Sequence, residues 1–182
     1  MVDALGIYTA VAVPAVVLIL LFTLVTGAPP MPSPPQTHDP ILELIPEDLE
    51  GVALELGSGW GSLALDIAQR RPKLRVRGIE LSPVPLLFSV LRPDRWGQPN
   101  LRLELGDFNR ADFGDGVKVV VVYLTPGNLA KLRPKLAQLP AGTLVISNTF
   151  AVPGWEPAEE RRAPRGNYPV YLYRLPQAFK GD

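Results

Sequence analysis

Hydrophobic and polar positions divide the chain into one long apolar run and a region of short alternating elements. The apolar run, IYTAVAVPAVVLILLFTLVT at 7–26, is about twenty residues long and has no charged side chain. Because a helix rises 1.5 Å per residue, this run is long enough to cross the roughly 30 Å hydrocarbon layer of a membrane. The pattern predicts a transmembrane helix. A cleaved signal peptide is the alternative, but no basic segment precedes the run.

A proline-rich segment, GAPPMPSPPQTHDP at 27–40, separates this run from the rest of the chain. Proline at this density favours an extended, semi-rigid spacer. We therefore predict an anchor over 1–27, a linker over 28–39 and a folded domain over 40–182. The single histidine, His38, is expected to be a solvated linker residue, because a metal site normally recruits several ligands.

From residue 52 onward, runs typical of strands alternate with stretches typical of helices. Strands are expected at 52–56, 74–81, 101–105, 117–124 and 142–150, and helices at 60–71, 83–92 and 127–139. This alternation predicts a mainly parallel sheet, with the apolar VKVVVVYL at 117–124 in its buried centre. The segment 160–175 differs, because two extended stretches flank a turn at Gly166 and Asn167. It predicts a hairpin-like edge.

Charge is unevenly distributed along the chain. All 18 Lys and Arg residues lie from Arg70 onward, whereas the part up to Gln69 contains eight acids and no basic residue. The basic residues of 70–182 are scattered and form no stripe interleaved with aromatic residues, so nucleic acid is not an expected partner. Cysteine is absent, which excludes disulfides and thiolate metal sites. We assign no metal.

Three glycines at alternate positions follow the first predicted strand of the domain. They are Gly57, Gly59 and Gly61 in LELGSGWGSL at 54–63. In a doubly wound sheet the first strand-to-helix turn lies where ligands bind against backbone amides and a helix N-terminus. The dinucleotide fingerprint requires G-x-G-x-x-G, so the observed G-x-G-x-G weakens an NAD interpretation.

Glu80 ends the second strand of the domain, 23 residues after Gly57. An acid at this place is positioned to bind both ribose hydroxyls of a nucleoside-containing ligand. The alternative is a surface acid paired with Arg75 or Arg77, which are near in sequence.

These residues together resemble the class I S-adenosylmethionine-dependent methyltransferases, whose first motif is an acid followed by G-x-G-x-G, here ELGSGWG at 55–61. The resemblance covers residues 50 to about 175, and GIELSP at 78–83, GDF at 106–108 and YLTP at 123–126 follow in the expected order. The stretches after residue 123 look more narrowly like a branch that includes membrane-anchored, archaeal and mitochondrial protein-lysine methyltransferases.

The resemblance implies a Rossmann-like, doubly wound α/β fold, with a mainly parallel seven-stranded sheet and an antiparallel edge. It implies S-adenosyl-L-methionine as cofactor, with its ribose at Glu80, its adenine at Asp107 and Phe108, and its methionine end at the glycine loop and Glu55. Tyr123 would face the transferred methyl group as the catalytic residue. The cofactor-binding residues that it implies are Glu55, Gly57, Ser58, Gly59, Gly61, Glu80, Leu81, Asp107 and Phe108.

By this resemblance the chain is expected to be a membrane-anchored, single-pass methyltransferase that modifies a protein lysine. Because S-adenosylmethionine is made in the cytosol, the catalytic domain is expected to face the cytoplasm. A lipid or quinone-like small molecule is the alternative acceptor, and a cofactor-binding protein without activity is the third possibility. The chain departs from this branch at Trp60, where many members have an acid in the glycine loop. This side chain could cover the methionine moiety or block a substrate. It also lacks an N-P-P-Y motif, which argues against DNA or glutamine amide methylation.

Overall fold

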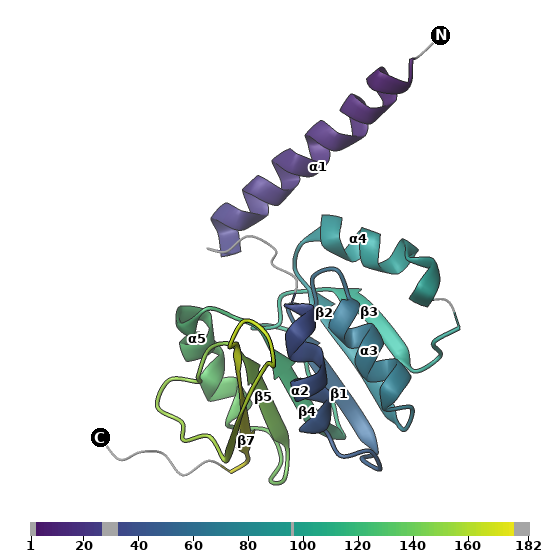
Figure 1. Ribbon diagram of the computed structural model, residues 1–182. Helices are drawn as coiled ribbons and strands as arrows, with labels where there is room; N and C mark the ends of the chain where they lie inside the picture. The colour runs from purple at the N-terminus through teal and green to yellow at the C-terminus, as the bar shows by residue number, and fades with distance from the viewer. Residues whose placement is uncertain (1–2, 27–32, 96, 177–182) are drawn as a thin grey trace.

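The computed structural model describes residues 3–26, 33–95 and 97–176 (Figure 1). Its main domain contains a seven-stranded sheet with the order β3-β2-β1-β4-β5-β7-β6. The strands are β1 (Gly51–Leu56), β2 (Leu74–Glu80), β3 (Leu101–Leu105), β4 (Val117–Val122), β5 (Leu144–Asn148), β6 (Glu159–Arg162) and β7 (Pro169–Arg174). The first five pair in parallel, whereas β7 runs antiparallel to β5 and β6. The predicted mainly parallel sheet with an antiparallel edge is confirmed.

Strand β4 occupies the centre of the sheet, between β1 and β5. Its residues Val119 to Val122 are at most 1% exposed. A central parallel strand is covered on both faces, so valine at every position is favourable there. This prediction from the apolar pattern is also confirmed.

Helices cover the two faces of the sheet unequally (Figure 1). The α-helices are α1 (Ala4–Thr26), α2 (His38–Glu43), α3 (Ser62–Arg70), α4 (Pro83–Leu91) and α5 (Pro126–Leu136), with short 3-10 helices η1 (Pro35–Thr37) and η2 (Pro93–Arg95). One core cluster joins α2 and α3 to the sheet, and the other joins α5 to its opposite face. Within the described chain no helix lies between β3 and β4 or between β5 and β6. Irregular segments at 106–116 and 149–158 make these connections instead.

The end of the proline-rich segment packs onto the domain. His38 begins α2 and is only 8% exposed, and its Nδ1 lies 2.5 Å from Oδ2 of Asp66 in α3. Thr37 is fully buried, and its Oγ1 accepts a hydrogen bond from Nδ2 of Asn148 at the end of β5. The expectation that His38 is a solvated linker residue is therefore wrong, because these tertiary contacts are invisible in the local sequence. Residues 27–32 lie outside the described residues, and the predicted linker boundaries stay a prediction.

Helix α1 extends away from the sheet (Figure 1). It contacts α4. In the three described stretches of the chain, no helix has the length and apolarity needed to cross a membrane. The predicted single-pass membrane location facing the cytoplasm is therefore wrong, and the predicted transmembrane helix and membrane partner find no support in this structure. Large apolar side chains of α1, such as Val13, Leu20 and Leu24, are mostly exposed, so the contact with α4 covers little of this helix.

Candidate active site

The glycine loop joins the carboxyl end of β1 to the start of α3 and is tied to the neighbouring strand. The backbone N–H groups of Gly57 and Ser58 both donate to the carbonyl of Ile79 in β2, at 2.8 and 3.2 Å. Gly59 and Gly61 both have positive φ, at 53° and 72°. A Cβ at Gly61 would lie 2.9 Å from Cβ of Ser89, whereas one at Gly59 would meet no atom within 4 Å. Gly61 therefore serves close packing, and Gly59 leaves the backbone open to a ligand.

Glu80 is a buried acid held by this loop. It is 8% exposed, its Oε2 accepts the N–H of Gly59 and its Oε1 accepts the N–H of Ser82, both at 2.7 Å. Arg77 instead pairs with Glu104, at 2.6 Å, so the alternative of a surface acid paired with that arginine is wrong. A carboxylate oxygen can accept a second hydrogen bond, which leaves Glu80 able to receive two hydroxyls.

Glu55 lies beneath the same loop and is 5% exposed. The backbone N–H of Ala64 donates to its carboxyl group, and Oε2 has no partner among the described residues. Burial raises the pKa of Glu55 to about 8, and the nearby charges of Glu80 and Asp66 act in the same direction, against the hydrogen bond from Ala64. This acid is therefore protonated at neutral pH when no cation is beside it.

Buried polar atoms without partners gather around the carboxyl ends of the strands. Such atoms are rare in proteins, and each one calls for an explanation such as a bound ligand or water. Apart from Nε1 of Trp155, those found among the described residues are Nε2 of His38, Oε2 of Glu55 and the hydroxyls of Ser58 and Ser82. Ser58 belongs to the glycine loop, and Ser82 follows Glu80 and the half-buried Leu81. The site therefore offers hydrogen-bonding groups to a ligand with hydroxyl and charged groups, as S-adenosylmethionine has.

Asp107 and Phe108 lie on the irregular segment after β3. Oδ1 of Asp107 accepts hydrogen bonds from the backbone N–H and Nδ2 of Asn109, at 2.9 and 3.0 Å. Phe108 is half-buried and packs against the core on the α5 side.

Lys135 on α5 anchors this segment, a role that the sequence does not reveal. Its Nζ donates to the carbonyls of Phe108 and Ala111, at 2.6 and 2.5 Å, and lies 3.9 Å from the ring centroid of Phe113. Burial lowers the pKa of Lys135. A lysine in a helix carries no local signal for a partner 27 residues away, which explains why sequence reasoning misses it.

Tyr123 follows β4 at the centre of the sheet and is half-buried. Its ring is nearly parallel to that of Phe150, with centroids 6.4 Å apart and an interplanar angle of 13°. Phe150 follows β5, the next strand in the sheet. Sequence reasoning does not select Phe150, although an aromatic residue just after a neighbouring parallel strand is an available signal. The two rings form an apolar wall at the carboxyl ends of β4 and β5.

Trp60, the unusual residue of the glycine loop, packs against α4. Its ring meets the ring of Phe88 edge-on, with centroids 5.2 Å apart and an interplanar angle of 86°. The indole is half-buried. Across the described residues, no group of three or more His, Cys, Asp or Glu side chains is placed to hold a metal ion.

Comparison with known proteins identifies the family. Residues 55–159, more than half of the chain, match the model of the ANTKMT methyltransferase domain. The chain belongs to this methyltransferase family. The matched range begins at Glu55 and includes the glycine loop, Glu80, Asp107 and Tyr123. The chain is thus an S-adenosylmethionine-dependent methyltransferase.

Individual relatives differ in their acceptors. A protein-lysine N-methyltransferase of Saccharolobus islandicus (strain REY15A) is 27% identical over 153 residues, which cover 82% of this chain and 94% of the relative. The crystal structure of an RNA methyltransferase from Salinibacter ruber, in complex with S-adenosyl-L-homocysteine, superposes with a TM-score of 0.73 at 30% identity and covers 84% of this chain and 98% of that one. A precorrin-6y C5,15-methyltransferase from Geobacter metallireducens GS-15, at 15% identity, shares the fold with a TM-score of 0.58 and covers 76% of this chain and 87% of that one.

Proposed function

We propose that this methyltransferase transfers a methyl group to the ε-amine of a lysine in a protein. The observation that carries this proposal is the similarity to the S. islandicus protein-lysine methyltransferase, which extends over almost the whole of that protein. The family match at residues 55–159 supports it.

The proposed cofactor site is built from the residues at the carboxyl ends of β1, β2 and β3. Glu80, held by two backbone N–H groups, would accept both ribose hydroxyls. The glycine loop and Glu55 would bind the methionine end, whose ammonium group would keep the Glu55 carboxylate ionised. Asp107 and Phe108 would hold the adenine. Ser58 follows β1, and Leu81 and Ser82 follow β2, so all three lie at the carboxyl ends of these strands. Their positions support this arrangement.

Tyr123 and Phe150 would form one wall of the channel for the acceptor side chain. S-adenosylmethionine supplies an electrophilic methyl group, and its transfer is an in-line displacement that requires alignment and a free lone pair on the amine. An apolar wall lowers the pKa of an entering lysine, because burial disfavours the charged ammonium. The paired rings can therefore favour the neutral, nucleophilic amine without a dedicated base. The backbone carbonyls around 123–126 would accept its N–H groups.

RNA is the second candidate acceptor, because the S. ruber RNA methyltransferase is 30% identical to this chain over 84% of its length. The sequence argues against it, since the basic residues form no stripe interleaved with aromatic residues.

The test is transfer of radiolabelled methyl groups from S-adenosylmethionine into a lysate of the source cells. After the reaction, separate samples are treated with protease, with ribonuclease, or extracted with organic solvent. We expect the label to become acid-soluble only after protease treatment, and a Tyr123→Ala variant to incorporate less. Release by ribonuclease would establish RNA as the acceptor, and label in the organic extract would establish a small molecule.

A further inference from the structure

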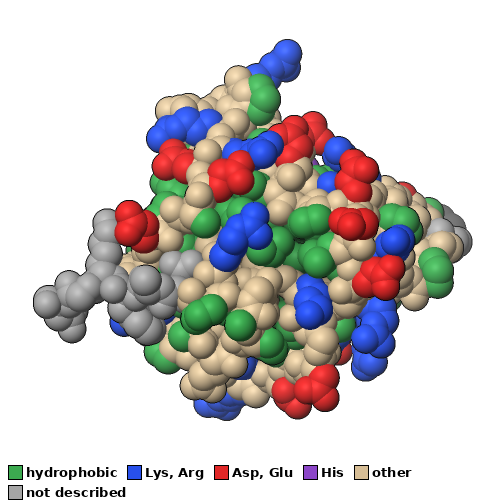
Figure 2. Space-filling view, turned by 90° about the horizontal axis from the view of Figure 1, so that it is seen from below, with side chains coloured by type: hydrophobic (Ala, Val, Ile, Leu, Met, Phe, Trp, Pro, Cys, Tyr) green, Lys and Arg blue, Asp and Glu red, His purple; other side chains and the backbone are tan. Residues whose placement is uncertain are grey.

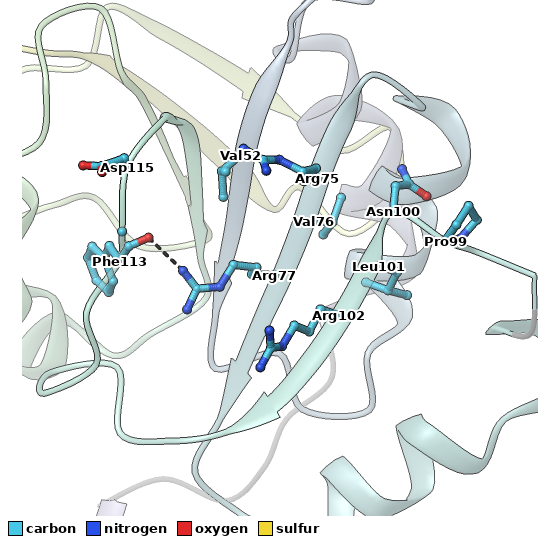
Figure 3. A pocket seen from close by; sticks show the side chains of 11 residues that line it. Val52, Arg75, Val76, Arg77, Pro99, Asn100, Leu101, Arg102, Phe113 and Asp115 are labelled. Carbon is cyan, nitrogen blue, oxygen red and sulfur yellow. Dashed lines mark hydrogen bonds between the residues drawn. The ribbon is translucent and has the colours of Figure 1, made fainter.

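A cavity lies at the amino ends of β1, β2 and β3 (Figure 3), whereas the candidate active site lies at the carboxyl ends of these strands. Its volume is about 420 Å³, and its lining includes Arg75, Arg77, Arg102, Val52, Phe113 and Asp115. Arg75 precedes Glu80 by five residues of the same strand, which corresponds to about 16 Å at 3.3 Å per residue. We call this cavity, with its three arginines, the arginine groove.

The arginine groove exists because no helix of the described chain covers this part of the sheet. The described chain connects β3 to β4 by the irregular segment 106–116. Arg77 is the register partner of Arg102 on the adjacent strand, and Arg75 lies two residues before Arg77. Alternation along a strand therefore places all three side chains on the same face, the face of Val52 and Phe113 rather than that of α3.

The three guanidinium groups differ in how firmly they are held. Arg77 donates to the carbonyl of Phe113 at 2.8 Å, drawn as a dashed line in Figure 3, and to Glu104 at 2.6 Å. Arg102 approaches the same glutamate at 3.3 Å, although its side chain is 77% exposed. Arg75 is exposed and has no hydrogen-bond or ion-pair partner among the described residues. Arg77 therefore shapes the groove, whereas Arg75 and Arg102 are available to a ligand.

The groove combines positive charge with an apolar floor. Val52 and Phe113 are buried, at 6% and 5% exposure. Two carboxylates, Asp115 in the lining and Glu104 beside it, partly offset the three arginines. The groove thus has a modest positive charge and apolar surface between the guanidinium groups.

We propose that the arginine groove binds an acidic segment of a partner protein. The planar guanidinium fork matches a carboxylate with two parallel hydrogen bonds, and the apolar floor accommodates the methylene groups of Asp and Glu side chains. A nucleic acid backbone fits less well, because it carries a charge on every nucleotide and binds through strongly positive surfaces. Glu104 and Asp115 repel any anionic ligand and leave the groove only modestly positive, so it suits a short acidic segment better than an extended polyanion. The face in Figure 2 likewise carries acidic and basic side chains interspersed.

The acidic segment would belong to the methyl acceptor protein. This assignment rests on the proposed function, but the binding of an acidic segment to the groove does not. Because the groove and Glu80 lie at opposite ends of strand β2, the acidic residues and the target lysine would be separated by at least about five extended residues. A second contact at this distance would raise the effective concentration of the acceptor at the active site.

The test is fluorescence anisotropy with a fluorescein-labelled hexaglutamate peptide and the full chain, without cofactor, so that failure of methyl transfer does not affect the result. The double variant Arg75→Gln/Arg102→Gln is compared with Lys131→Gln/Arg165→Gln, which removes the same charge at exposed positions elsewhere. We expect saturable binding that weakens with salt, and a loss of about tenfold in affinity for the groove variant. The control variant should stay within about twofold of the wild type.

Three results would overturn the proposal. The first is no binding of hexaglutamate by the wild type at millimolar concentration. The second is equal loss in both variants, which would indicate attraction by overall charge only. The third is tighter binding of a labelled hexauridylate with the same dependence on Arg75 and Arg102, which would identify a phosphate site instead.

Discussion

The substitution Glu55→Gln should change how the stability of the protein depends on pH. Glu55 is buried, and its pKa is raised to about 8 chiefly because burial disfavours the carboxylate. Glutamine imitates the protonated acid: its carbonyl oxygen can still accept the N–H of Ala64, and it never ionises. The variant therefore removes one titration while it preserves the shape of the site.

The magnitude follows from the difference between the folded and unfolded states. In the unfolded chain Glu55 ionises near the ordinary glutamate pKa of 4.5, whereas in the folded protein it keeps its proton up to about pH 8. A group whose folded pKa is raised contributes its full stability below the unfolded pKa and loses it as pH rises toward the folded pKa. Each pH unit within this window costs up to about 1.4 kcal/mol. Between pH 5 and pH 7 the free energy of unfolding of the wild type should therefore fall by about 2 to 3 kcal/mol more than that of the variant.

Urea denaturation at pH 5, 6 and 7, without cofactor, measures this difference directly. Other titrating groups affect both proteins equally, so the difference between the two free energies of unfolding reports on Glu55. As the pH rises, the free energy of unfolding of the wild type should fall toward or below that of Glu55→Gln. Parallel pH profiles for the two proteins would refute the reasoning and show that Glu55 is ionised in the folded protein at pH 7.

Substitutions at three further positions, Glu80, Lys135 and Tyr123, test the candidate active site. Glu80→Ala should weaken binding of S-adenosylhomocysteine by roughly 10- to 150-fold in calorimetric titration, because a charged partner of two hydroxyls is lost; unchanged affinity in a folded variant would remove Glu80 from the site. Lys135→Met should weaken the same binding by about tenfold, because it releases the segment that holds Phe108. The control Lys131→Met, at an exposed position of the same helix, should leave the binding unchanged. Equal effects of the two variants would contradict a positioning role for Lys135. Tyr123→Phe should keep kcat within about threefold of the wild type because the stacked pair remains, and Tyr123→Ala should lower kcat by about tenfold; a large loss in the phenylalanine variant would mean that the hydroxyl takes part.

The sheet could be predicted from the sequence because each strand carries a local signal. The valines of β4 predicted its central position, and the turn at Gly166 and Asn167 predicted the antiparallel edge formed by β6 and β7. The positions of the glycine loop and Glu80 at strand ends were likewise predictable, since parallel strands bring their carboxyl ends to one edge.

Other features depend on contacts between distant residues. The pairing of His38 with Asp66 and the anchoring of Phe108 by Lys135 join residues almost thirty positions apart, and no local pattern reports them. The membrane prediction rested on hydropathy alone, and among the described residues no helix has the length and apolarity that a membrane span requires. The arginine groove was missed because it depends on the absence of a helix after β3 in the described chain, which becomes visible only in the fold.

Identification of the methylated atom tests the proposed function most directly. The purified chain is incubated with proteins of the source cells and S-adenosylmethionine carrying a trideuterated methyl group, and peptides are then sequenced by mass spectrometry. The proposal predicts deuterated methyl groups on lysine ε-nitrogens, lost in the Glu80→Ala variant and restored by added wild type. Deuterated methyl groups found in the RNA of the same reaction, with none on lysine, would contradict it.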